Sequence, residues 1–96
     1  DVAGYAEVVP DLVVEVASPR DSRRAAHDKA HMWLGHGVRL VWVVHPEARA
    51  VDVYRPDHDT LTNSGDEALD GFDVLPGFSC ALEAVFGPER TTPRTA

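Results

Sequence analysis

The stretch "PDLVVEVASPRD", residues 10–21, indicates the class of fold and raises the question of function. A short run of β-branched and aliphatic residues between two prolines is typical of a buried strand, here predicted over residues 11–17. Side chains alternate along a strand, so Asp11, Glu15 and Ala17 share one face. Both faces are largely apolar, which suits a central strand of an α/β sheet.

Glu15 is the strongest single sign of a site. A carboxylate in a valine-rich strand must be ion-paired, hydrogen-bonded or metal-bound to stay charged. The plainer alternative is a strand close to the end of the sheet, with Glu15 reaching solvent or pairing with an arginine. Composition alone favours that alternative.

The residues after this strand predict a helix over residues 19–36. Ser18 is a typical N-cap, Pro19 suits the first helical position, and Asp21 adds a negative charge to the first turn. A pair of glycines ends the pattern.

Lys29 is the second sign of a site, because it falls within the apolar arc predicted for this helix. At about 100° per residue, the arc holds Ala25, Ala26, Ala30, Met32 and Trp33. A lysine in such an arc commonly extends its ammonium to water. Alternatively, the ammonium lies near Glu15 and serves an active site.

His27 and His31 are four residues apart, the spacing of zinc ligands on a helix. The intervening residues in "HDKAH" lack the glutamate that zinc peptidases place after the first histidine. Both histidines lie on the polar arc and no third ligand is evident, so a solvated helix face is favoured.

The remaining elements complete an α/β pattern. A buried strand and an antiparallel hairpin partner should follow the helix, then a short edge strand, a loop, an extended segment and a short C-terminal helix. The three strands are predicted over residues 38–44, 50–55 and 60–62. The loop is predicted over residues 63–71, the extended segment over 72–78, and the helix from residue 79 onward. We expect one domain over residues 1–88, with 89–96 a frayed tail.

Bulk composition limits the function. The net charge of −7 argues against a broadly basic nucleic-acid groove, but not against a local basic patch or a metal site. No apolar run is long enough to cross a membrane. The one cysteine, Cys80, fits a reducing compartment, so a cytoplasmic location is expected.

The ordered motifs resemble a known family. "PDLVVEVASPRD", a helix with Lys29, "GVRLVWVVHPEARAVDVYRP" and "DVLPGF" closely resemble the Uma-two family of bacterial proteins, placed among the PD-(D/E)XK restriction-endonuclease-like nucleases. The resemblance runs from about residue 4 to residue 86. It implies a mixed sheet flanked by helices, incomplete at the N-terminus, and a metal-dependent DNA-cleaving site.

The resemblance also implies roles for particular residues. Glu15 matches the acidic residue of the (D/E)XK element, Ala17 stands where lysine is usual, and Lys29 matches the position to which that lysine has moved in related families. Asp1 resembles the end of the segment that carries the first aspartate. Glu15 and Asp1 would then bind Mg²⁺ or Mn²⁺.

Asp11 is a further candidate catalytic residue, because it shares the face of Glu15. The two Cα atoms should be about 13 Å apart, too far to share one metal ion easily. Asp11 also suits the start of a strand after Pro10. His45 replaces the aspartate usual in this family before a proline, a position typical of a turn.

Two functions from different classes remain open. The first is an endonuclease acting on DNA, completed by an N-terminal segment or by a homodimer. The second is a catalytically inactive domain that binds a protein partner or dimerises through the unpaired edge of its first strand. The sequence does not separate these from a third function, structural stabilisation of a larger protein.

Overall fold

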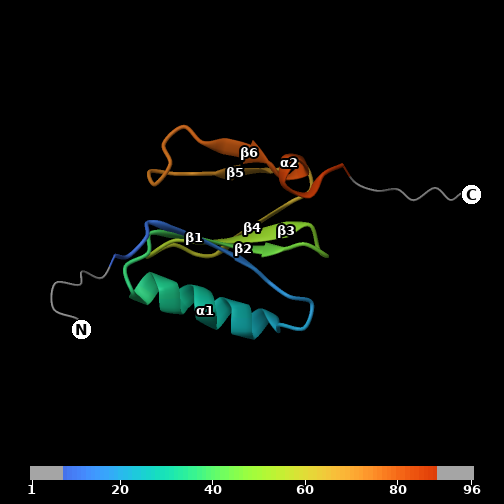
Figure 1. Ribbon diagram of the computed structural model, residues 1–96. Coiled ribbons are helices and arrows are strands. Elements are labelled where there is room, and N and C mark those ends of the chain that lie inside the picture. Colours follow the sequence, from blue (N-terminus) through green and yellow to red (C-terminus); the bar gives the residue numbers. More distant parts are fainter. Residues whose placement is uncertain (1–7, 89–96) are drawn as a thin grey trace, which may run out of the picture.

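The computed structural model describes residues 8–88 and contains a four-stranded sheet between two layers (Figure 1). The strand order is β1-β2-β3-β4; β1 is parallel to β2, and the other neighbours are antiparallel. Helix α1 covers one face, and the hairpin β5-β6 with helix α2 covers the other. The elements are β1 Leu12–Val16, α1 Arg23–Gly35, β2 Leu40–His45, β3 Ala50–Tyr54, β4 Leu61–Ser64, β5 Ala68–Asp70, β6 Ser79–Ala81 and α2 Leu82–Phe86. The predicted mixed α/β sheet flanked by helices is confirmed.

Strand β1 lies at an edge of the sheet, not at its centre. Within residues 8–88 it pairs only with β2, so its other edge is unpaired, and Val16 is 65% exposed. The central position predicted from its two apolar faces is therefore wrong for the described part of the chain. The unpaired edge expected of this strand is present.

Helix α1 begins later than predicted. Its N-cap is Ser22, whose Oγ accepts a hydrogen bond from the backbone N–H of Ala25 at 2.9 Å. Residues 18–21 instead form a turn, in which Asp21 Oδ2 accepts from the N–H of Ser18 at 2.9 Å. The N-cap prediction for Ser18 is wrong because Asp21 holds the Ser18 backbone in that turn.

The packed face of α1 is also rotated from the predicted arc. Ala30 is fully buried and packs on the sheet together with Ala26, Trp33 and Leu34. Met32, expected within the arc, is 44% exposed. Lys29 therefore lies at the flank of the packed face rather than at its centre.

The β2-β3 hairpin forms the centre of the sheet and was predicted correctly as antiparallel. The next strand, β4, pairs with β3 and ends at Ser64. Residues 63 and 64, predicted as loop, therefore belong to a strand.

The second layer differs most from the prediction. The predicted loop contains β5, and β6 starts at Ser79, where the helix was expected. The helix α2 begins three residues later, at Leu82. The segment "FDVLPGF", predicted as extended, forms turns that connect the two short strands. This layer covers one of the two buried clusters of the core, which consists of Leu40, Trp42, Val51, Val53, Leu69 and Leu82.

Among residues 8–88, no helix is both long and apolar enough to cross a membrane.

Candidate active site

Glu15 and Lys29, the two main candidates from sequence, lie side by side. Lys29 Nζ is 3.3 Å from Glu15 Oε1. The Glu15 side chain is 25% exposed, whereas that of Lys29 is 57% exposed. The ammonium thus reaches the carboxylate from the rim of the helix–sheet interface, with one side open to solvent.

Trp33 is a second partner of Glu15 that sequence reasoning missed. Its indole Nε1–H donates to Glu15 Oε2 at 2.8 Å. Trp33 is one helical turn after Lys29, so both side chains extend from α1 toward the same carboxylate. Two donors on one helix therefore fix the position of Glu15 on β1. The signal was weak, because a tryptophan on an apolar arc is usually a core residue.

A small cavity of about 80 Å³ opens beside this pair. Its walls come from the end of β1, the turn that follows, α1 and β2, and consist of Glu15, Val16, Ala17, Asp21, Ala26, Lys29 and Val43. Asp21 brings a second carboxylate to the cavity that holds Glu15. The sequence indicated only a helix-start role for Asp21, since its position depends on the turn at residues 18–21.

Asp11 lies away from this cavity. Its Oδ1 is 3.7 Å from Nη1 of Arg39, and Nη2 of the same arginine donates to Asp73 Oδ2 at 3.1 Å. Asp11 is not among the residues that line the Glu15 cavity. Asp1 lies outside the described residues.

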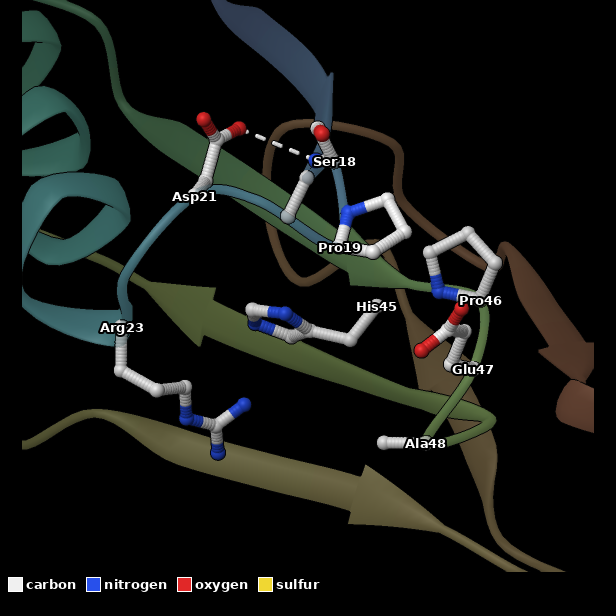
Figure 2. A pocket seen from close by; sticks show the side chains of 9 residues that line it. Ser18, Pro19, Asp21, Arg23, His45, Pro46, Glu47 and Ala48 are labelled. Carbon is white, nitrogen blue, oxygen red and sulfur yellow. Dashed lines mark hydrogen bonds between the residues drawn. The ribbon is translucent and has the colours of Figure 1, made fainter.

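A second, larger cavity of about 200 Å³ adjoins the first, because Ala17 and Asp21 line both. Figure 2 shows the His45 imidazole lying across it, between Pro19 and Arg23. His45 Nε2 is 2.9 Å from Asp52 Oδ2. The sequence predicted that His45 belongs to a turn. Its side chain also makes this contact with Asp52.

Asp52 is the buried carboxylate of the sheet, on the face that α1 covers. Thr62 Oγ1–H donates to its Oδ1 at 2.7 Å, and Arg23 Nη1 lies 3.7 Å from its Oδ2. Strand pairing places Glu15, Val43, Asp52 and Thr62 in one row across the four strands. Asp52 stands between valines, as Glu15 does, and that shared pattern was the signal that could have found it.

Comparisons with known proteins show the family of the chain and its fold. A model of the Uma2 (Uma-two) family, described as "Putative restriction endonuclease", matches residues 2–83. The chain belongs to the Uma2 family. No protein with a curated description matches it.

A solved structure shows that this Uma2 chain has a nuclease-like fold. It is a crystal structure from Anabaena variabilis, described as a "putative nuclease belonging to DUF820". The match has a TM-score of 0.74 at 23% sequence identity and covers 83% of this chain. The Uma2 chain spans 45% of the length of that structure.

The described residues of the Uma2 chain fit a divalent metal only in part. Residues 8–88 contain no group of three or more histidine, cysteine, aspartate or glutamate side chains able to hold one. Glu15 has the right chemistry, since Mg²⁺ is commonly held by one or two carboxylates, with water and phosphate oxygens completing the shell. Asp21 supplies a second carboxylate to the same cavity.

His27 and His31 pack against Tyr54 rather than forming a metal centre. Their ring centroids are 4.3 Å apart, and each lies 5.5 Å from that of Tyr54. His27 Nδ1 is also 3.3 Å from the Tyr54 hydroxyl. Burial, reinforced by the charge of Asp52 and opposed by Arg23, raises the pKa of Tyr54 above its ordinary value of 10.0.

Proposed function

We propose that this Uma2 chain carries the reaction centre of a metal-dependent endonuclease that hydrolyses DNA phosphodiester bonds. The observation that carries the proposal is the 3.3 Å contact between Lys29 and Glu15 at the wall of a cavity. The family match supports the same reaction class.

Each residue of this pair has a distinct role in the proposed reaction. Lys29 is exposed enough to turn its ammonium toward a phosphate while its stem remains on the helix. There it stabilises the negative charge that grows on the phosphate oxygens as water attacks. Trp33 keeps Glu15 in place through its bond to Oε2, so Glu15 Oε1, which Lys29 contacts, is the oxygen that can bind a cation once the ammonium turns to a phosphate.

Glu15 would hold Mg²⁺ or Mn²⁺, together with water, phosphate and ligands outside the described residues such as Asp1. When bound, the metal supplies a Lewis acid for the phosphate and lowers the pKa of an attacking water.

DNA is the proposed partner despite the net charge of −7. Arg23 and Lys29 of α1 line the two adjoining cavities, and Arg20 lies in the turn before the helix. Such a local group of cations can contact a phosphate backbone.

The deciding experiment is cleavage of supercoiled plasmid with Mg²⁺ or Mn²⁺. We expect Glu15→Gln and Lys29→Ala each to lower the rate at least about 100-fold, the loss typical when a charge-stabilising group is removed. Arg24→Ala is the matched control, because Arg24 lies on the same helix and pairs only with exposed Asp28 among the described contacts. Cleavage that survives Glu15→Gln would rule out this site.

One observation favours a second function, a protein-binding or dimerisation domain. The edge of β1 is open in residues 8–88, and Val14 and Val16 are exposed beside it. Such an edge can pair with a strand of a second copy or of another segment. Sedimentation of the wild type and of Val16→Lys distinguishes the cases: a dimer lost in the variant supports this function, and a monomer in both contradicts it.

A further inference from the structure

The His45 and Asp52 pair is a buried polar unit that the roles of Glu15 and Lys29 leave unused. The side chains are only 11% and 9% exposed. Asp52 is bonded from two sides, by His45 at one oxygen and by Thr62 at the other. A histidine held by a buried carboxylate, which is itself fixed by a third group, is the arrangement by which enzymes orient an imidazole for proton transfer.

The contact with Asp52 determines which ring nitrogen of His45 can accept a proton. A carboxylate can only accept, so the nitrogen facing it, Nε2, carries the hydrogen. In the neutral ring, Nδ1 then holds the free lone pair. Asp52 also stabilises the ring after it becomes positively charged, as a buried carboxylate does for a catalytic histidine.

His45 lies one strand away from Glu15, on the same face of the sheet. Ala17 continues the parallel pairing of β1, since its N–H donates to Val44 O at 2.8 Å, which places His45 one strand away from Ala17 on the face of Glu15. From strand spacing, the Cα atoms of Glu15 and His45 are roughly 8 Å apart. The imidazole lines the larger cavity, which shares Ala17 and Asp21 with the Glu15 cavity.

We propose that His45 is the general base of the reaction and that Asp52 is its positioning residue. This inference rests on the proposed nuclease function. Water attacks the phosphorus of a phosphodiester bound across the two cavities and gives its proton to Nδ1 of His45. The new P–O bond forms as the bond to the leaving sugar oxygen breaks. That oxygen takes a proton from solvent, and His45 later returns its own to solvent, so one water is consumed for each phosphomonoester and alcohol formed.

The charges that face His45 come from every element around it. Asp52 on β3 contacts the ring directly, and Arg23 on α1 lies 3.7 Å from the same carboxylate oxygen. Asp21 and Glu47 line the same cavity from the turns after β1 and β2. Asp52 is the charged group in contact with the ring, and Asp21, Arg23 and Glu47 are the other charged residues that line its cavity.

The test must separate a base from a residue that only supports the sheet. His45→Gln is the informative variant, because the glutamine amide can still donate to Asp52 but cannot accept a proton as a base. We expect kcat for plasmid cleavage to fall about 100-fold or more, the usual contribution of general base catalysis, with a smaller change in KM. The urea midpoint should remain close to that of the wild type. His58→Gln is the matched control, since His58 is exposed and its ring contacts only Pro56 O among the described side-chain hydrogen bonds.

Two further readouts would not respond to a structural role. The wild-type rate should fall as the pH is lowered and the base becomes protonated, and this acid limb should be absent from the residual activity of His45→Gln. In His45→Ala, added imidazole should restore cleavage at least 5-fold, whereas it should not stimulate His58→Ala. Asp52→Asn should lower kcat and leave the variant responsive to pH, because the base is still present.

The outcomes separate this inference from the function on which it rests. If Glu15→Gln abolishes cleavage but His45→Gln cleaves at the wild-type rate with the wild-type pH profile, His45 is not the base and the nuclease function stands. If neither the wild type nor any variant cleaves with either metal, the proposed function fails and this inference fails with it. Imidazole rescue of His45→Ala, with loss of the acid limb in His45→Gln, supports it.

Discussion

The indole of Trp33 donates to Glu15 Oε2 over 2.8 Å, while Lys29 approaches the other oxygen of the same carboxylate. Two side chains from successive turns of α1 therefore contact the Glu15 carboxylate of β1. Both oxygens of the carboxylate thus have a polar partner next to Val43 and the other apolar residues of the interface.

Trp33→Phe should weaken this arrangement while keeping most of the packing. The lost hydrogen bond to a partly exposed carboxylate should lower the free energy of unfolding by about 1 kcal/mol, in addition to the cost of the smaller ring. A double-mutant cycle with Glu15→Gln, measured by urea denaturation, isolates the bond. A coupling energy near zero would mean that the indole and the carboxylate do not interact in solution.

The sequence indicated the Glu15–Lys29 pair as one of two interpretations, because a charge in a valine-rich strand and a lysine in an apolar helix arc each need either a partner or access to water. It did not predict Trp33, because an indole on that arc is explained by packing alone. His45 and Asp52 are joined through hairpin geometry and the pleat of β2 and β3, so their contact depends on a register that composition does not reveal.

The same contrast applies to the fold. Strands β2 and β3 are continuous apolar runs separated by a short turn, and their pairing was predicted. Strands β5 and β6 have three residues each and are separated by the turns around Gly71 and Phe78. Such short strands carry too few alternating residues to produce a pattern, and their pairing depends on tertiary contacts with the sheet.

The two serines before α1 should differ in their effect on stability. Ser22→Ala removes the N-cap bond to Ala25 and should lower the free energy of unfolding by about 1 kcal/mol. Ser18→Ala removes only an exposed bond to the N–H of Arg20 and should cost less than about 0.5 kcal/mol. Urea denaturation followed by circular dichroism compares the two variants. A larger loss of stability in Ser18→Ala would mean that Ser18 is the N-cap, as the sequence predicted.

Tyr54 should make stability depend on alkaline pH. Burial and the charge of Asp52 raise its pKa in the folded state above 10.0, so the folded protein resists ionisation of the phenol. The resulting stability is present below the unfolded value and is lost as the pH rises through the folded one. The free energy of unfolding should therefore decline above about pH 10.

Tyr54→Phe tests this linkage. The variant should lose the 3.3 Å contact with His27 Nδ1 and show a shallower decline at alkaline pH than the wild type. Tyr5→Phe, which changes the other tyrosine of the sequence, is the control. Absorbance titration of tyrosinate in Tyr5→Phe reports Tyr54 alone, and a transition at the ordinary tyrosine value would contradict the raised pKa.

Gly71 should tolerate no side chain, because it lies at a close approach of the turn between β5 and β6. A Cβ built there would lie 2.5 Å from the backbone oxygen of Leu75 and 2.9 Å from Cβ of Phe78. The backbone must move to relieve these contacts, so Gly71→Ala should lower the free energy of unfolding by about 2 kcal/mol. Gly35→Ala is the matched control, since no atom lies within 4 Å of a Cβ at Gly35 and alanine favours the helix. Urea midpoints should therefore move in opposite directions for the two variants, and an unchanged midpoint in Gly71→Ala would show that this turn adopts a looser conformation.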